Sequence, residues 1–138
     1  KLNHQITLGA QGEYLYAEQL SGDKKGYTLP FSPPWSSNLT VTYHPKNKIF
    51  GTDGDIQLEY KITGAQDRIV PPENKTKEYQ TINMSLGRSW QINQKQIKIR
   101  IQGQNLLNKR YYDHTSYYRL IDVPEPGRNI SVMIGYNF

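Results

Sequence analysis

At the end of the chain, apolar or aromatic residues recur at every second position, and the residues between them are mostly polar or small. The apolar or aromatic positions are Ile130, Val132, Ile134, Tyr136 and Phe138, and those between them are Ser131, Met133, Gly135 and Asn137. Successive side chains of a β-strand point to opposite faces, whereas a helix repeats every 3.6 residues. The pattern predicts a terminal strand whose two faces meet different environments.

Five further segments repeat this alternation, at about 5–19, 37–44, 55–65, 78–92 and 96–106. In the third of them, Ile56, Leu58, Tyr60 and Ile62 alternate with Gln57, Glu59, Lys61 and Thr63. No segment of useful length has the i, i+3, i+4 spacing of an amphipathic helix. The sequence therefore predicts an all-β protein in which six antiparallel strands form a meander. Its terminal strand is expected to pair with 96–106.

Shorter and longer connections alternate between these segments. The shorter ones lie at 45–54 and near 93–95, and the longer ones, rich in Pro and Gly, at 20–36, 66–77 and 107–127. Transmembrane β-barrels alternate short periplasmic turns with long extracellular loops in this way, and their strands need about 9–11 residues. Such barrels have at least eight strands. We therefore expect the six strands to belong to a longer polypeptide.

The composition agrees with strands rather than helices as the membrane-spanning elements. The mean hydropathy is −0.77, and no run approaches the roughly 18 apolar residues of a spanning helix. Eleven tyrosines against three phenylalanines suit a membrane–water interface, because tyrosine has an apolar ring and a polar hydroxyl. The net charge of +5 does not indicate nucleic-acid binding, since Lys98 and Arg100 alternate with isoleucines on one strand.

The sequence offers no enzyme chemistry. It contains no nucleophile elbow, phosphate-binding loop or zinc-binding helix motif, and it has no cysteine. His4, His44 and His114 are too far apart for a metal-ligand signature. We therefore predict no catalytic residue, no resident metal and no cofactor.

Three sequence blocks resemble one known family. They are Leu29-Pro30-Phe31-Ser32-Pro33-Pro34 before a strand, Gln104-Asn105-Leu106-Leu107-Asn108-Lys109-Arg110-Tyr111-Tyr112-Asp113-His114 at the end of the penultimate strand, and Pro126-Gly127-Arg128-Asn129 before the last. All three are similar, in order, to the C-terminal end of TonB-dependent outer-membrane receptors. From the residues alone, we expect Gly127 to allow a tight turn because glycine accepts a positive φ.

The resemblance implies a 22-stranded barrel in the Gram-negative outer membrane, of which residues 1–138 are the C-terminal portion, with the plug domain and earlier strands absent. It implies active uptake of a scarce ligand such as a metal chelate, most often a ferric siderophore or haem, powered through TonB by way of the absent N-terminal region. Outer-membrane lipid, lipopolysaccharide and the barrel-assembly machinery are the other implied partners. Arg128 could meet anionic headgroups at the outer rim or form a salt bridge there.

The longest connection contains the best candidate ligand site. Its aromatic, imidazole and guanidinium groups could stack on or hydrogen-bond a metal chelate: Tyr111, Tyr112, His114, Tyr117, Tyr118 and Arg119. The same tyrosines could instead belong to the aromatic girdle that surrounds such barrels. The family also implies an assembly signal at Tyr136 and Phe138, which could equally be interfacial aromatics.

Two other classes of protein remain open at this point. One is a soluble β-sandwich or lipocalin-like module that binds a carbohydrate or another small ligand. The other is a structural barrel of the autotransporter or small-porin type. The apolar side chains separate the first class from a membrane barrel, because they would pack in a core in a soluble module and face lipid in a membrane barrel.

Overall fold

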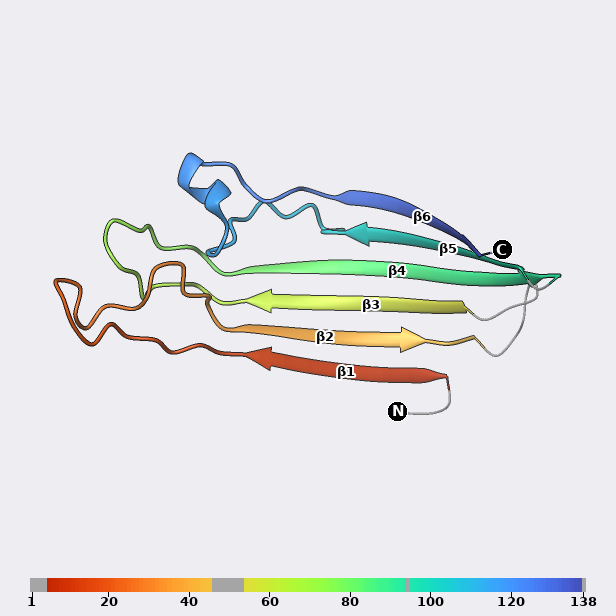
Figure 1. The fold of residues 1–138 in the computed structure, drawn as a ribbon, viewed down its shortest axis with the longest axis horizontal. Coiled ribbons are helices and arrows are strands. Elements are labelled where there is room, and N and C mark those ends of the chain that lie inside the picture. Colours follow the sequence, from red (N-terminus) through yellow and green to blue (C-terminus); the bar gives the residue numbers. More distant parts are fainter. Residues whose placement is uncertain (1–4, 46–53, 94, 138) are drawn as a thin grey trace.

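The computed structural model describes residues 5–45, 54–93 and 95–137, and they form one six-stranded sheet (Figure 1). Its strands are β1 (Ile6–Glu13), β2 (Ser36–Tyr43), β3 (Gly54–Thr63), β4 (Tyr79–Ile92), β5 (Lys95–Gln104) and β6 (Asn129–Asn137). A short 3₁₀ helix, η1 (Tyr117–Ile121), precedes β6. All neighbouring strands are antiparallel and follow the chain order, so the predicted all-β meander is confirmed.

Most strand ends agree with the sequence prediction within two residues, but the first strand is shorter than predicted. It ends at Glu13, which pairs with Ser36 at the start of β2, rather than continuing to residue 19. The chain before Ser36 contains Pro33 and Pro34. Because proline has no backbone N–H, it cannot donate to a ladder, and the pairing stops where these residues would extend it.

The sheet has one continuous apolar face. Through the strand register, Leu8 lies opposite Val41, Val41 opposite Leu58, and Leu58 opposite Met84. A second row crosses the other strands, where Leu86 pairs with Ile101 and Ile101 with Val132. These side chains remain exposed, from 36% for Met84 to 59% for Val132. The apolar residues therefore line one surface of the sheet and do not form an internal core.

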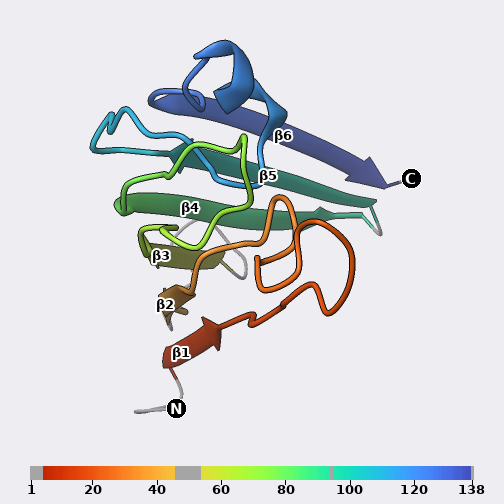
Figure 2. The ribbon, with the colours of Figure 1, turned by 90° about the vertical axis from the view of Figure 1, so that its left-hand side faces the viewer.

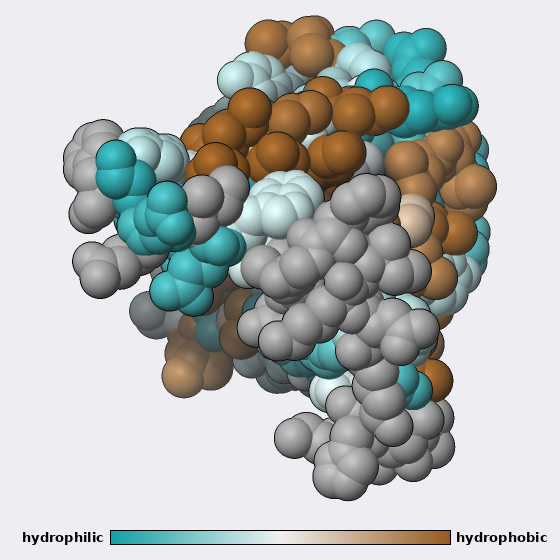
Figure 3. All heavy atoms as spheres, turned by 90° about the vertical axis from the view of Figure 1, so that its right-hand side faces the viewer, coloured by the Kyte–Doolittle hydropathy of each residue, from teal (hydrophilic) through white to brown (hydrophobic). Residues whose placement is uncertain are grey.

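The molecule buries little hydrophobic surface. Val70 and Tyr79 are the buried hydrophobic side chains within the described ranges, and both lie near one end of the sheet. The accessible surface is 10074 Å², compared with about 7,400 Å² for a compact monomer of this mass. Figure 3, seen from the end with the C-terminus, shows broad hydrophobic areas on the surface. Such a face needs a covering, and a lipid bilayer would supply one.

Aromatic side chains flank the apolar face. Near the long loops, the Trp35 indole covers Gly64, where an added Cβ would lie 2.1 Å from Trp35 Nε1. Toward the other end lie Tyr43, Trp90 and Tyr136, which share that face through the register. Barrels in the outer membrane have aromatic girdles at both interfaces. Within the described part of the chain, no helix is long and apolar enough to cross a membrane.

Hydrogen bonds connect the strands across the opposite, polar face. Glu59 on β3 accepts from Asn38 on β2 at 3.2 Å and from Asn83 on β4 at 2.7 Å. Asp55 on β3 and Arg100 on β5 form a salt bridge of 3.0 Å above β4. Gly87 of β4 lies between them in register, and a Cβ there would be 2.4 Å from Asp55 Oδ1. The missing side chain therefore leaves room for this salt bridge.

Candidate functional site

Three long loops meet at one end of the sheet. We call residues 14–35 the first loop, 64–78 the second loop and 105–128 the third loop. In Figure 2, which looks onto this end, the second loop lies between the other two. The alternation of long and short connections predicted from the sequence places all three at the same end, because an antiparallel meander returns there after every second strand.

A buried salt bridge joins the loops. Arg119 of the third loop contacts Glu73 of the second loop at 2.9 Å, and their side chains are only 4% and 8% exposed. The same Glu73 carboxylate accepts the backbone N–H of Phe31, in the first loop, at 2.9 Å. The Arg119 guanidinium also lies 5.0 Å from the centre of the Phe31 ring. One ion pair therefore holds segments from all three loops together.

The surroundings of Glu73 favour its charged form. Burial by itself raises the pKa of this carboxyl. Hydrogen bonds from the backbone N–H groups of Phe31 and Val70, together with the positive charge of Arg119, outweigh burial and hold the pKa below its usual value. Phe31 has a φ of 57°, a left-handed conformation that is costly for a residue with a side chain. Its hydrogen bond to Glu73 stabilises this conformation.

His114 is the most deeply buried of the predicted ligand residues, at 1% exposed. Its Nδ1 is hydrogen-bonded to the Thr76 hydroxyl at 3.0 Å, and its carbonyl accepts from Arg119 Nε at 2.6 Å. Burial and the neighbouring Arg119 charge lower the pKa of the imidazole. The Nε2 atom is buried and has no hydrogen-bond partner among the residues described. The ring is therefore part of the packing between the second and third loops.

Tyr111 and Asp113 attach the third loop to β4. The rings of Tyr111 and Tyr79 stack with centroids 4.1 Å apart, and the Tyr79 hydroxyl donates to Asp113 at 2.8 Å. Burial raises the pKa of Tyr111, and the nearby carboxylates of Glu125 and Asp113 add to this. For Asp113, burial acts to raise the pKa, but hydrogen bonds from Thr115 and Tyr79 lower it overall.

The remaining predicted tyrosines are more accessible. Tyr117 and Tyr118, at the start of η1, are 74% and 58% exposed. Tyr117 contacts the Phe31 ring at 4.8 Å, while the Tyr112 hydroxyl donates to Asp122 at 2.7 Å. The structure thus brings the six predicted residues into one loop cluster but divides them by exposure. His114 and Arg119 are enclosed, and Tyr117 and Tyr118 are open to solvent.

Two asparagines define the base of the third loop. Asn105 has a φ of 47°, and its side chain bonds to the Lys109 N–H and carbonyl and to the Pro126 carbonyl. The Asn108 side chain accepts the Arg128 N–H at 2.9 Å. Gly127 does not have the positive φ expected for it. Glycine is instead needed there because a Cβ would lie 2.8 Å from Asn108 Oδ1.

Neither the pairing of Glu73 with Arg119 nor the structural roles of the two asparagines was predicted from the sequence. Glu73 stands among prolines and polar loop residues, and no local pattern connects it with Arg119. The asparagines belong to the block already compared with receptor sequences, where their ability to adopt positive φ was an available signal. In the described ranges, no group of three or more His, Asp or Glu residues could hold a metal ion.

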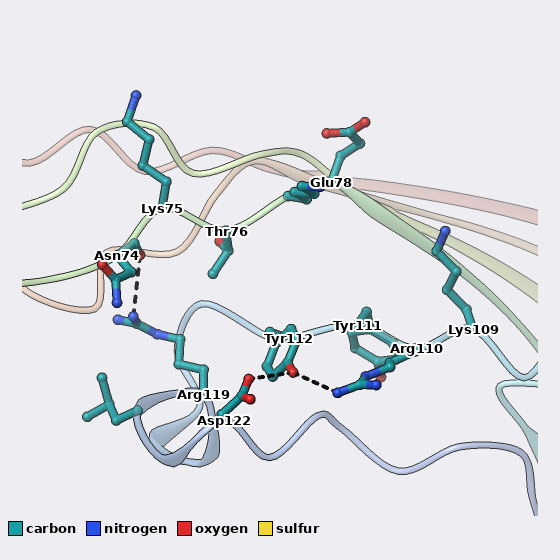
Figure 4. Close-up of a pocket in the computed structure, with 12 residues that line it drawn as sticks. Asn74, Lys75, Thr76, Glu78, Lys109, Arg110, Tyr111, Tyr112, Arg119 and Asp122 are labelled. Atoms are coloured by element: carbon teal, nitrogen blue, oxygen red, sulfur yellow. Dashed lines mark hydrogen bonds between the residues drawn. The ribbon is translucent and has the colours of Figure 1, made fainter.

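A cavity of about 510 Å³ opens beside this cluster, between 74–78 of the second loop and 109–112 of the third (Figure 4). It is also lined by Arg119, Leu120 and Asp122.

At the other end of the sheet, the Tyr136 ring lies 5.9 Å from the Lys95 ammonium. Phe138, the second residue of the expected assembly signal, and His4 lie outside the described residues, as does most of the predicted connection 45–54.

Comparison with known proteins identifies the family. A family model for the TonB dependent receptor-like β-barrel matches residues 2–106, which is more than half of the chain. This region includes the block from Leu29 to Pro34, and it ends within the first three residues of the block from Gln104 to His114. No curated protein matches the sequence. Receptors of this family are transporters rather than enzymes, and their transport across the outer membrane depends on TonB. The chain belongs to the TonB-dependent receptor β-barrel family of the Gram-negative outer membrane.

Proposed function

We propose that this chain forms six neighbouring strands, the C-terminal portion, of a larger barrel that imports an iron complex, either a ferric siderophore or haem. The observation that supports a barrel wall is the unbroken, exposed apolar face across β1 to β6, with charged and amide groups on the opposite face. Lipid on one side and a wet lumen on the other suit this division. Because β1 and β6 each have an unpaired edge, further strands of a 22-stranded barrel would complete the wall.

The three long loops are the proposed extracellular part. In this orientation the turn after β4 and the end of β6 are periplasmic. Tyr136 and Phe138 would then be read there by the barrel-assembly machinery. Arg128, at the loop end of β6, would approach lipid or lipopolysaccharide headgroups. TonB would act through a plug-bearing region that is separate from these strands.

Within the loops, we assign ligand contact to the exposed tyrosines. Tyr117 and Tyr118, with the half-buried Tyr112 beside them, offer rings and hydroxyls that could stack on and hydrogen-bond a chelate or porphyrin. Tyr111, His114 and Arg119 support them, since Tyr111 stacks on Tyr79 and the other two are almost fully enclosed. A buried neutral imidazole would reach haem iron only after the loop cluster had opened. The proposed first contact is therefore the surface of η1.

An uptake experiment tests this function. The intact receptor would be expressed in an iron-starved, receptor-deficient Gram-negative strain, with haemin or a ferric catecholate as the iron source. We expect growth with at least one of the two in a strain with TonB and none in a strain lacking it. Growth that is independent of TonB would contradict energised transport. TonB-dependent uptake of another solute, with neither iron complex imported, would overturn the iron assignment alone.

Two tyrosine variants, one in η1 and one outside it, test the assignment of ligand contact to η1. Tyr118→Ala should weaken binding of the imported complex about tenfold, the ratio that corresponds to 1.4 kcal/mol. Tyr14→Ala removes a tyrosine of the first loop that is even more exposed, at 72% against 58% for Tyr118, and should change the affinity less than twofold. Fluorescence quenching by the iron complex would measure both affinities. Equal affinities for Tyr118→Ala and the unchanged receptor would overturn the assignment.

A further inference from the structure

The cavity beside the loop cluster lies where two paired strands separate. β4 and β5 remain in register up to Met84 and Gly103, and the Leu106 N–H still donates to the Ile82 carbonyl at 2.9 Å. Asn105, just before this hydrogen bond, has a φ of 47° and forms the turn with which the third loop begins. Because the Asn105 side chain holds this turn through three hydrogen bonds, the separation is built into the fold.

The cavity lining is strongly cationic. It contains five basic residues, Lys75, Lys77, Lys109, Arg110 and Arg119, and two acidic residues, Glu78 and Asp122. The volume of about 510 Å³ lies in the range of small-molecule sites, which are roughly 300–1,000 Å³. A concave surface with an excess of one charge concentrates ions of the opposite charge. The lining therefore favours an anionic occupant.

The five basic groups differ in how far their charge is already compensated. Arg119 is paired with Glu73, and Lys75 with Asp67 at 3.3 Å. Lys77 and Lys109, by contrast, form no salt bridge with any residue that the structure describes. Figure 4 shows Lys109 pointing into the space between the two segments, while Lys75 points away from it. Lys77 and Lys109 are thus the lining lysines whose charge no described carboxylate compensates.

Arg110, which also lines the cavity, adds a guanidinium that is held in a fixed orientation. Its guanidinium donates to the Tyr112 hydroxyl at 3.2 Å, and that hydroxyl donates onward to Asp122. This chain of hydrogen bonds holds one edge of the guanidinium and leaves its other N–H groups for a further acceptor. A guanidinium and two ammonium groups that line the same cavity suit the oxygens of a phosphate or carboxylate.

We propose that this cavity is a binding site for an anionic group, a phosphate or a carboxylate, held by Lys77, Lys109 and Arg110. The proposal does not rest on import of an iron complex, because it is argued from the basic side chains between the two loops, although Tyr112 and Leu120 also line the cavity. The anion can come from a lipid headgroup at the outer rim or from a soluble molecule. Both sources present the same oxygens to the same three cations.

Lysine labelling of the intact receptor in a zwitterionic detergent tests the site directly. Acetic anhydride modifies accessible lysines, and mass spectrometry reports the extent at each. We expect 10 mM inorganic phosphate or citrate, or phosphatidylglycerol added to the micelles, to slow modification of Lys77 and Lys109 at least threefold. Lys25, an exposed first-loop lysine that does not line the cavity, serves as the internal control. Its modification should stay unchanged.

The pattern of protection identifies the source of the anion. Protection by phosphate or citrate supports a soluble anion, and protection by phosphatidylglycerol alone supports a lipid headgroup. No protection by any of the three, or equal protection of Lys25, overturns the proposal. In a direct titration, Lys77→Gln with Lys109→Gln should weaken binding of the protecting anion at least tenfold, and Lys25→Gln less than twofold. The labelling needs no variant, so a misfolded variant leaves the test intact.

Discussion

Glu73 and Arg119 lie 46 residues apart and form a salt bridge of 2.9 Å that is almost closed to solvent. Their side chains join the loop that precedes β4 to the loop that follows β5, and the backbone N–H of Phe31 connects the first loop to the same pair. A buried ion pair adds little net stability, because desolvation offsets most of its attraction. Its effect is on specificity: a loop arrangement that separates the partners leaves a charge unpaired.

Removal of one partner should therefore open the loops. Glu73→Gln leaves the Arg119 guanidinium buried and unpaired, which costs about 3–5 kcal/mol. Asp67→Asn is the matched control, because it breaks the Lys75–Asp67 pair, whose side chains are 63% and 70% exposed. Such an exposed pair contributes about 1 kcal/mol or less. Hydrogen exchange should show loss of protection in 64–78 and 105–128 for the first variant only, and equal protection in both variants would contradict this role.

The loop cluster should also loosen in acid, beginning with His114. Burial and the Arg119 charge lower the pKa of this imidazole below its usual 6.5, despite the opposing charges of Glu73 and Asp113. Between that lowered value and 6.5 the open loops bind more protons than the closed ones, so the closed state loses stability as the pH falls below 6.5. Glu73 has a pKa below its usual 4.5, and its contribution is lost only as the pH falls through that lower value.

Limited proteolysis of the third loop would detect the loosening caused by protonation of His114. Cleavage should accelerate between pH 7 and pH 5.5 in the unchanged protein. His114→Gln keeps a polar side chain that can bond to Thr76 but cannot gain a proton, so its cleavage rate should be nearly constant over this range. The same acceleration in both proteins would show that another group is responsible.

The polar face offers a test of packing across a strand. Gly87→Ala would place a Cβ 2.4 Å from Asp55 Oδ1 and 2.9 Å from the Arg100 guanidinium. The salt bridge would have to shift, and overpacking of this kind costs about 1–3 kcal/mol. Gly135→Ala is the control on the same face, since its Cβ would meet Lys98 at an ordinary 3.8 Å. Urea unfolding of the barrel in vesicles should separate the two variants, whereas equal midpoints would contradict this steric account.

Neighbouring residues of β6 should respond in opposite ways to a charge. Ile134 is 72% exposed on the apolar face, and Met133 points to the polar face. Lysine facing lipid near the bilayer midplane costs about 2–4 kcal/mol, whereas a lumen position tolerates it. Ile134→Lys should therefore lower the amount of folded receptor in the outer membrane, and Met133→Lys should not. The opposite result would reverse the assignment of the two faces.

The sequence by itself determined the six strands, their order and the identity of the two faces. Alternation with period two is a local property, and adjacent antiparallel strands need only short-range information to pair. The first strand departed from its prediction because its end depends on a partner strand, where Pro33 and Pro34 interrupt the ladder. The sequence also marked the third loop as the candidate site, from its composition.

Only the tertiary structure decided which of those loop residues are buried and which are open. Three features join residues that are distant in the chain. They are the contact between Glu73 and Arg119, the salt bridge that crosses β4 at Gly87, and the cavity between two loops. No periodicity encodes such contacts, because they arise when strand register brings loop ends together and side chains then compete for the same space. His114 illustrates the difference, as a loop histidine in the sequence and a packed, 1% exposed ring in the fold.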